Sequence, residues 1–380
     1  MPKVGGVSTI VALREPPPET RVALVPDAVA SLVRGGHVVV IQAGAGEHAF
    51  HTDAAYAAAG ARVLSGAELA AALAGADVLT HVRALAVERI QALRPGAVTV
   101  GLDAPFDDEA RLSVLNARKI TALSFERLPR TSRAQAMDVL SSQAFAAGYR
   151  AVLEAAIRLP RFFPLAMTAA GTVPPAKVVV LGVGVAGLEA IATARRLGAQ
   201  VSANDIRPDS AEEVRSVGAT FIDVGIGEAA GTGGYARDLE VSAARRQQEA
   251  LAPYIADADV LITTAAVPGR AAPRLVTAEM VAAMRPGSVV VDLAAASGGN
   301  VEGSRPGQDV RVPSARGGGD VVIVGPASAP SDLPADSSRL YAKNVTNVLA
   351  LLIDEDGSLR LDFADDIVAG MCLTHDGSSR

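Results

Sequence analysis

The chain has 380 residues, a formal net charge of −6 and a single cysteine, Cys372. This length predicts two domains, and an apolar fraction of 49% is enough for two cores. The charge gives no basic footprint for nucleic acid, and one cysteine excludes both an internal disulfide and a zinc site built from cysteines. With no leader peptide and no apolar run of membrane-spanning length, the sequence predicts a soluble, cytoplasmic polypeptide.

Strands and helices alternate over the first 125 residues. Strands are predicted at 8–13, 37–42, 77–82, 97–102 and 120–125. Helices are predicted at 27–34 (with Asp27 as N-cap), 53–60, 67–74, 87–93 and 107–116. This alternation predicts a parallel α/β domain, which carries no phosphate-binding fingerprint.

The segment 127–143 breaks this rhythm. Arg130, Arg133, Gln135 and Asp138 crowd a stretch that opens a helix, which continues over 144–159. Taken alone, such a stretch is equally a solvated loop followed by a helical turn. The following residues, 162–175, are predicted to form an irregular connector.

A dinucleotide-binding unit is predicted from residue 176 onward. A β-branched run at 177–181 leads into Gly182, Gly184 and Gly187 in G-x-G-x-x-G spacing, and a helix follows at 186–196. The three glycines allow the tight turn, the approach of a pyrophosphate, and close packing of helix on strand. The amides near Val185 and Ala186 lie at the helix N-terminus and are the expected phosphate donors.

A second strand at 200–205 ends on Asp205, eighteen residues after Gly187. An acid at this position binds the ribose hydroxyls of the adenosine half and repels a 2′-phosphate, so NAD is favoured over NADP. Arg207 stands nearby, and an arginine can accommodate that phosphate. The competing interpretation is a glycine-rich turn that binds nothing.

The rest of the second half continues the α/β pattern. Helices are predicted at 211–217, 238–251 and 277–284, and strands at 220–224, 258–265, 288–293 and 320–324, the last being the final strand. A glycine-rich insert occupies 225–234. A linker at 330–334 leads to a helix at 341–352 that returns to the first domain, followed by a polar tail. The prediction is therefore two Rossmann-like domains, 1–143 with 330–380 and 144–329, with a nucleotide cleft between them.

Several motifs together resemble one family, the NAD(H)-binding component (domain I) of proton-translocating nicotinamide nucleotide transhydrogenase, which is related to alanine dehydrogenase. The resemblance covers nearly the whole chain. The motifs are 130–143, 167–175, the glycine motif and 233–236. This resemblance implies that Arg130, Gln135 and Asp138 surround the nicotinamide and its ribose as the catalytic group.

Further site residues are implied by the same resemblance. Residues 233–236 match a mobile loop that folds over bound NAD(H). The remaining implied cofactor contacts are Arg133, Ser141, Val185, Asp205, Ile206, Arg207, Gly234, Tyr235 and Ala266. The sequence departs from the family pattern at Ala296, where relatives usually have an acid, at Asp332, where some have Arg, and at 317–319.

Hydride transfer between two nicotinamides needs no general acid or base, only two rings held roughly 3–3.5 Å apart with water excluded. This chain has one convincing dinucleotide motif, so NADP(H) is expected on a partner domain. The resemblance implies a membrane-spanning partner that couples hydride transfer to proton translocation, a homodimer, and a place at the cytoplasmic membrane through partner subunits. No metal site is expected.

Two alternatives stay open: an NAD-dependent amino-acid dehydrogenase of the alanine type, and a catalytically silent NAD-binding regulator. A dehydrogenase needs a proton donor, usually His or Lys. None of the five histidines falls in 97–106, where the family resemblance places that donor, and His81 is expected to be a core histidine. Arg21 and Arg83 are either remnants of a carboxylate-binding cleft or, as the favoured interpretation, solvated or paired across the domain interface.

Overall fold

The computed structural model describes residues 7–207, 209–225, 236–266, 271–354 and 356–380, with only the backbone described for 236–244. The chain divides into two compact units. The first unit contains the chain up to Gln143 together with Ser331–Arg380, and the second contains Ala144–Pro330. The expected α/β class with a discontinuous first domain is confirmed, since the C-terminal segment completes the first sheet.

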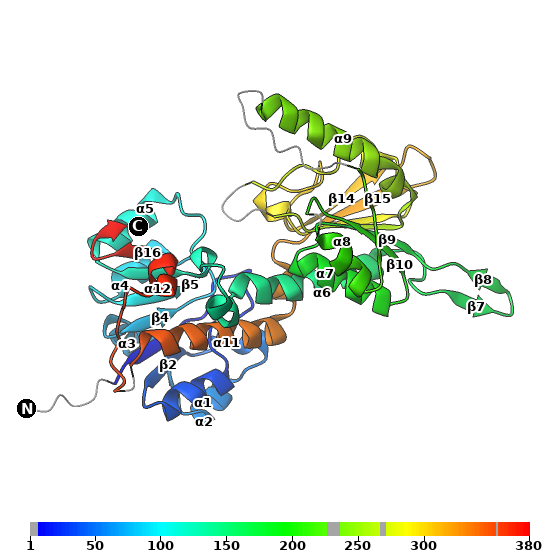
Figure 1. Ribbon diagram of the computed structural model, residues 1–380. Helices are drawn as coiled ribbons and strands as arrows, with labels where there is room; N and C mark the ends of the chain where they lie inside the picture. Colours follow the sequence, from blue (N-terminus) through cyan, green and yellow to red (C-terminus); the bar gives the residue numbers. More distant parts are fainter. Residues whose placement is uncertain (1–6, 208, 226–235, 267–270, 355) are drawn as a thin grey trace, which may run out of the picture. The chain divides into compact units, whose positions relative to one another are not determined.

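The first unit is built on a mainly parallel sheet with the order β17-β16-β6-β5-β4-β1-β2-β3 (Figure 1). The strands from the N-terminal segment are β1 (Thr9–Ala12), β2 (Val38–Gln42), β3 (Arg62–Leu64), β4 (Val78–Thr80), β5 (Val98–Gly101) and β6 (Thr121–Ser124). Strand β3 lies outside every predicted strand. The helices are α1 (Pro26–Arg34), α2 (Asp53–Ala58), α3 (Gly66–Ala74), α4 (Val87–Ala92), α5 (Glu109–Ala117) and α11 (Pro334–Leu352).

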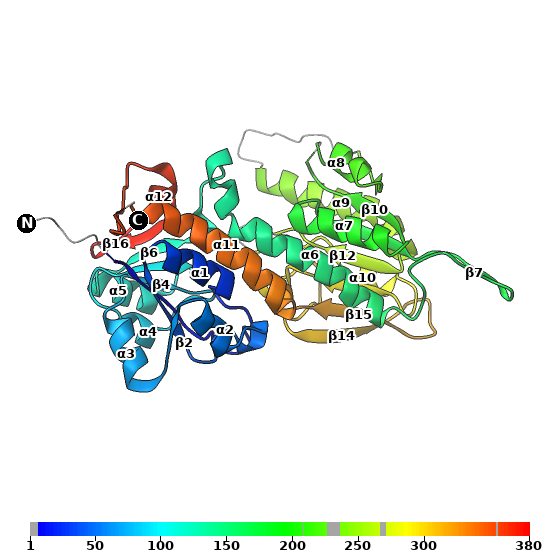
Figure 2. The same cartoon turned by 90° about the horizontal axis from the view of Figure 1, so that it is seen from below.

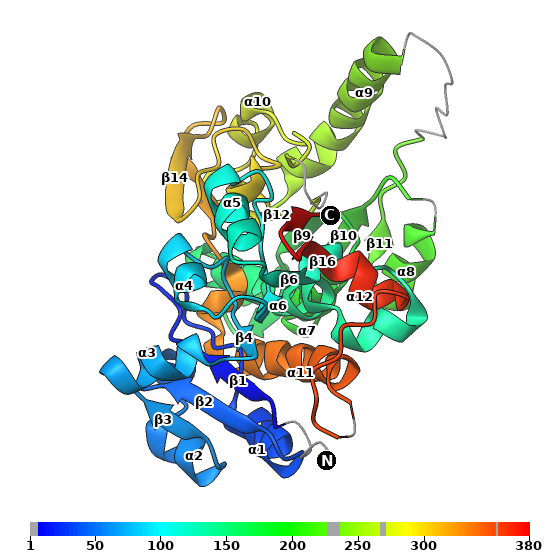
Figure 3. The ribbon, with the colours of Figure 1, turned by 90° about the vertical axis from the view of Figure 1, so that its left-hand side faces the viewer.

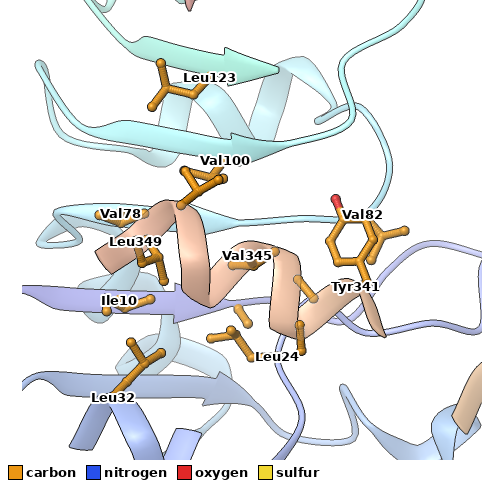
Figure 4. Packing of buried hydrophobic residues seen from close by; sticks show 14 of the residues in the cluster. Ile10, Leu24, Leu32, Val78, Val82, Val100, Leu123, Tyr341, Val345 and Leu349 are labelled. Atoms are coloured by element: carbon orange, nitrogen blue, oxygen red, sulfur yellow. The ribbon is translucent and has the colours of Figure 1, made fainter. Parts of the chain in front are cut away.

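Helix α11 is the centre of the larger core of this unit. Tyr341, Val345 and Leu349 pack on one face of the sheet against residues such as Ile10 and Val78 (Figure 4). A separate core covers the other face with apolar side chains of α3, α4 and α5. The predicted return of this helix to the first domain is thus confirmed, and it begins earlier than predicted, at Pro334.

The C-terminal tail is more ordered than predicted. It contains α12 (Asp366–Met371), β16 (Cys372–His375) and β17 (Ser378–Ser379). Strand β16 lies beside β6 (Figure 3) and pairs antiparallel with it. In this pairing Cys372 is opposite Leu123. The prediction that 320–324 is the final strand is therefore wrong, because the tail extends a sheet formed some 250 residues earlier in the chain.

The predicted N-cap of the first helix is also wrong. Helix α1 begins at Pro26 after Val25, which has extended backbone and makes no side-chain cap. Asp27 lies inside the first turn, where its charge is favourable beside the helix N-terminus. Proline at the first position explains the earlier start, since its fixed φ suits a helix and its missing N–H is not needed there.

The second unit is a seven-stranded sheet with the order β11-β10-β9-β12-β13-β15-β14. Its strands are β9 (Lys177–Leu181), β10 (Gln200–Asn204), β11 (Thr220–Phe221), β12 (Val260–Thr263), β13 (Val289–Asp292), β14 (Gln308–Pro313) and β15 (Asp320–Gly325). Its helices are α6 (Val139–Arg158, which begins in the first unit), α7 (Val185–Arg196), α8 (Ser210–Ser216), α9 (Ala236–Asp257) and α10 (Ala278–Ala282).

Both faces of this sheet are covered. Along β9, Val178 and Val180 face a core shared with α6 and α7, and Val179 and Leu181 face a core shared with α9 and α10. This explains why the strand reads as an unbroken apolar run. Strand β14, which was not predicted, adds an antiparallel edge beside β15.

Residues 162–175 do not form the predicted irregular connector. They contain an antiparallel hairpin of β7 (Ala166–Thr168) and β8 (Gly171–Val173) that projects from the second unit (Figures 1 and 2). Gly171, with φ +132, allows the tight reversal. Met167 is 76% exposed. Across the described part of the chain, no helix has both the length and the apolar character needed to cross a bilayer.

Candidate dinucleotide-binding site

The predicted glycine turn lies at the point where the strand order of the second sheet reverses. Strand β9 pairs with β10 on one side and with β12 on the other, so chain segments diverge from the ends of β9 and β12. Open α/β sheets bind ligands outside the carboxyl ends of such strands. Gly182 follows β9, and Thr264, Ala265 and Ala266 follow β12, which places the predicted turn and the predicted Ala266 at this one location.

The first and third glycines are required by close contacts. Gly182 has φ +95, and a Cβ there would lie 2.7 Å from the Thr264 Oγ1 atom. A Cβ on Gly187 would lie 1.9 Å from the carbonyl oxygen of Gly182. Thr264 donates its hydroxyl to that same carbonyl at 3.1 Å. The turn is therefore fixed by contacts that leave no room for larger residues.

Gly184 differs from these two glycines. It is the residue before α7, its φ is −76, and a Cβ there would have no atom within 4 Å. The protein fold itself does not require glycine at this position. The space beside Gly184 is open, and Val185 after it is exposed. A pyrophosphate could therefore approach the N-terminus of α7 at this point.

Asp205 follows β10 and is already held in place. Its Oδ2 atom accepts from the Val183 amide at 2.7 Å, and its Oδ1 atom accepts from the Arg207 amide and Nε at 2.9 and 3.2 Å. Arg207 also donates to the Val183 carbonyl. The hydrogen bond to Asp205 raises the pKa of Arg207. The acid is thus fixed against the glycine turn, while its neighbour Ile206 is 81% exposed.

A helix from the start of the second unit supports the same turn. A Cβ on Gly148 of α6 would lie 2.1 Å from the carbonyl oxygen of Ala186 in the first turn of α7. The two helices run beside each other in Figure 2. Gly148 was not predicted as a site residue, because only the packing of the two helices reveals its role.

The predicted loop of the first unit has a different character. Arg130 and Gln135 are exposed, and neither side chain has a hydrogen-bond partner among the described residues. Residues Ser132–Met137 form a 3₁₀ helix before α6. Asp138 accepts from the amide and the hydroxyl of Ser141 at 2.9 and 2.5 Å, so these two residues cap the N-terminus of α6.

Two asparagines of α11 hold this loop from behind. Asn344 and Asn347 both donate to the carbonyl of Ala136, at 2.9 and 2.6 Å, and Asn344 also accepts from Ser142 at 2.7 Å. Sequence reasoning missed them because they follow the loop by some 200 residues. Gln135 is therefore an exposed side chain on a firmly held backbone.

Arg133 already has partners inside the first unit. Its guanidinium donates to both oxygens of Asp365 at 2.7 and 2.6 Å and also contacts Asp366. The hydrogen bonds from Arg133 lower the pKa of Asp365, which caps α12. The role of Arg133 as a cofactor contact stays a prediction. In the structure, its ion pairs with Asp365 and Asp366 join the loop to the C-terminal segment.

Other predicted positions can be placed briefly. Gly234 and Tyr235 lie outside the described residues. Ala296, the departure from the family's acid, is exposed in a 3₁₀ helix just after β13. Among the described residues, no group of three or more His, Cys, Asp or Glu side chains could hold a metal ion.

Arg21 contradicts the favoured expectation of a solvated or interdomain arginine. It is 5% exposed and donates from Nε and Nη2 to the two carboxylate oxygens of Glu19, both at 2.8 Å. Arg83 reaches the same carboxylate at 3.1 Å. The Glu19 side chain is fully buried, and a buried cation such as Arg21 needs a paired opposite charge. Arg21 and Arg83, the two candidate cations for a substrate carboxylate, are thus both paired with the carboxylate of Glu19.

The same end of the first sheet holds three buried carboxyl groups, two whose pKa is raised and one whose pKa is lowered. Burial raises the pKa of Asp103, whose Oδ2 atom is enclosed with no partner among the described residues, and burial likewise raises the pKa of Glu15. For Glu19, burial raises the pKa, but hydrogen bonds and charge from Arg21 outweigh it and lower the value to about 2. His81 is 1% exposed and binds the Arg83 carbonyl through Nδ1.

Replacing Glu19 by Gln is expected to lower the free energy of unfolding by about 3 kcal/mol at pH 7, because Arg21 would be left buried without a counter-charge. Since the pKa of Glu19 is depressed to about 2, its contribution is complete above the unfolded value near 4.5 and is lost as the pH falls toward 2. Urea denaturation from pH 8 to 3 measures this, and the gap between variant and wild type should shrink only below pH 4.5.

The matched control is Glu47→Gln, since Glu47 is exposed and lies 3.5 Å from Arg14. It should cost less than about 1 kcal/mol. If the two variants were equally stable, the buried ion pair would not be a significant stabilising interaction.

The fold and the glycine turn after β9 are those of two-domain α/β dinucleotide-binding proteins. Family profiles match both halves of the chain: alanine dehydrogenase/PNT, N-terminal domain, over residues 11–147, and alanine dehydrogenase/PNT, C-terminal domain, over residues 151–380. The chain belongs to the alanine dehydrogenase/PNT family.

Within this family the chain is similar to transhydrogenase subunits. An NAD(P) transhydrogenase subunit alpha (its first part) of Rhodospirillum rubrum is 45% identical over 371 residues, which are 95% of this chain and 94% of the relative. The crystal structure of transhydrogenase from Sinorhizobium meliloti matches with a TM-score of 0.86 and 42% identity, covering 98% and 100% of the two chains. An alanine dehydrogenase of Mycobacterium tuberculosis is 35% identical over 76% of this chain and 72% of its own.

Proposed function

We propose that this chain is the NAD(H)-binding component of a proton-translocating NAD(P) transhydrogenase. In the overall reaction, NADH and NADP⁺ give NAD⁺ and NADPH, with one hydride moving from one ring to the other and no proton exchanged with a substrate oxygen. The observation that carries this proposal is the match to a transhydrogenase subunit across 95% of the chain and 94% of that relative.

The residues present fit the cofactor. Gly184 leaves an open cradle at the α7 N-terminus for a pyrophosphate, and Asp205 is fixed where it can accept from ribose hydroxyls. When bound, the dihydronicotinamide supplies the hydride. Arg130 and Gln135, exposed on a loop with a fixed backbone, orient its carboxamide and ribose, with Asp138 and Ser141 capping the helix behind them. Val185, Ala186, Ile206, Arg207, Gly234, Tyr235 and Ala266 complete the proposed contacts.

The partners follow from the same proposal. NADP(H) binds to a separate domain, and a membrane-spanning subunit couples hydride transfer to proton movement and holds this chain at the cytoplasmic membrane. A homodimer is supported by apolar side chains that the second unit exposes: Phe145, Tyr149 and Ile157 on α6, with Ile157 at 76%, and Met167 on the β7–β8 hairpin. Large exposed apolar side chains are common where two proteins meet.

The amino-acid dehydrogenase alternative has the support of the 35% identity to an alanine dehydrogenase. Two observations weigh against it. Arg21 and Arg83, the cations that would hold a substrate carboxylate, are both bound to Glu19. The range 97–106, where the resemblance places a proton donor, contains neither histidine nor lysine, and its Asp103 is buried with a raised pKa. An enclosed carboxyl group is out of reach of a substrate that binds from solvent.

The proposal is tested by two measurements on the purified chain. Titration should give at least ~10-fold tighter binding of NADH than of NADPH, because Asp205 repels a 2′-phosphate. Addition of the NADP(H)-binding domain of a transhydrogenase should then give hydride transfer between the two nucleotides. Turnover of alanine with NAD⁺ in place of hydride transfer would establish the dehydrogenase, and NADH binding without either activity would establish the regulator.

A further inference from the structure

The side chain of Asn300 joins the two ends of the segment that follows β12. Its Oδ1 atom accepts from the Ala265 amide at 3.0 Å, and its Nδ2 atom donates to the carbonyls of Ala265 and Pro273, both at 2.8 Å. The residue is completely buried. We infer that Asn300 is a positioning residue that sets where Ala265 and Ala266 stand, and so where the nicotinamide binds; this inference rests on the proposed function.

Asn300 can act in this way because its own backbone is fixed on both sides. Its amide donates to Asp292 Oδ1 at 3.3 Å, and its carbonyl accepts from the amides of Leu275 and Val276 at 2.8 and 3.0 Å. Asp292 is itself fully buried and stands at the end of β13. It also accepts from Thr263 Oγ1, Ala294 and Val301. The side chain therefore projects from a rigid part of the sheet edge.

The chemistry of the contact requires an amide. Ala265 presents one donor and one acceptor, and the Asn300 amide pairs with both, as a neighbouring strand would. A carboxylate of the same shape could accept from the Ala265 amide, but it has no hydrogen to give to the two carbonyls. Asp at this position would leave those two carbonyls without the Asn300 donor and would place a charge at a fully buried position.

The effect of this contact extends to the proposed nicotinamide site. The Ala265 amide lies against the glycine turn, 3.1 Å from where a Cβ of Gly182 would be, and Ala266 next to it is exposed. The glycine turn and Asp205 are held by different hydrogen bonds, made by Thr264 and Val183. Loss of the Asn300 amide should therefore disturb the nicotinamide half of the site and spare the adenosine half.

The experiment compares Asn300→Asp with wild type by titration with NADH and with ADP-ribose, which has the adenosine, pyrophosphate and second ribose but no nicotinamide. Wild type should bind NADH more tightly than ADP-ribose. In the variant, NADH binding should weaken about 10-fold, to the level of ADP-ribose, whose own affinity should change less than ~2-fold. With the NADP(H)-binding domain added, kcat should fall at least ~10-fold.

Asn300→Ser, which removes the amide without adding a charge, should give the same pattern and carries the test if Asn300→Asp does not fold. Asn116→Asp, on α5 of the first unit, is the control for the same chemical change elsewhere and should match wild type. Equal weakening of NADH and ADP-ribose, or no change in either, would overturn the role of Asn300. Failure of the wild-type protein to transfer hydride to NADP⁺ would instead contradict the proposed function. The two outcomes can be told apart because the ratio of the NADH and ADP-ribose affinities is measured without hydride transfer.

Discussion

Replacing Gln135 by Asn should slow hydride transfer by about 10²-fold while NADH affinity stays within about 3-fold of wild type. The backbone of this loop is held by Asn344 and Asn347, so a shorter side chain moves the amide away from the nicotinamide without moving the loop. In the proposed site the phosphates and adenosine bind elsewhere, at the glycine turn and Asp205. Single-turnover transfer from NADH, in the presence of the NADP(H)-binding domain, separates the rate of transfer from binding.

The matched control is Gln91→Asn, an exposed glutamine on α4 of the same unit, which should transfer hydride at the wild-type rate. If Gln135→Asn abolished NADH binding, the loop would be an anchor for the cofactor and would not be limited to orienting the ring. If it changed neither quantity, Gln135 would have no role in the site.

Replacing Gly184 by Ala should weaken NADH binding about 10²-fold, roughly 2.7 kcal/mol, with little change in the fold. The added methyl group meets no protein atom within 4 Å and φ is −76, so the free protein tolerates it. The free energy of unfolding should fall by less than about 1 kcal/mol, the typical effect of alanine before a helix. In the bound state the same methyl group would occupy the space through which the pyrophosphate approaches the α7 amides.

Gly187→Ala provides the contrast. Its methyl group would lie 1.9 Å from the Gly182 carbonyl, so it should reduce both stability and NADH affinity. Calorimetric titration and thermal melting of the two variants therefore separate a glycine kept for the ligand from one kept for the fold. NADH affinity of Gly184→Ala within about 3-fold of wild type would mean that the phosphates do not bind at this turn.

The features that could be predicted from the sequence are those set by neighbours along the chain. The run at 177–181 is β9 with identical bounds, and α7 begins one residue before its prediction. Apolar runs, glycine spacing and helix breakers are local signals, so they locate the sheet strands and the turn. The position of Asp205 beside the turn could be predicted for the same reason, because strand, turn and helix have nearly constant lengths in such a unit.

What could not be predicted depends on residues distant in the sequence. Strand β16 pairs with β6 across about 250 residues, and nothing in the polar tail indicates that partner. Asn300 and Asn344 have ordinary sequence surroundings, and only their hydrogen bonds reveal what they hold. Arg21 had a local signal that was overlooked, because its partner Glu19 is only two residues away in the sequence.

The return of the C-terminal segment to the first sheet has a consequence for synthesis on the ribosome. The second unit has all of its residues once Pro330 has been made, whereas the first still lacks α11 and β16. The apolar face of the first sheet that Tyr341, Val345 and Leu349 later cover therefore stays exposed while the whole second unit is translated. The first unit is therefore the first to be translated but the last to complete its fold. While its apolar face is exposed, the nascent chain offers a surface that a chaperone can bind.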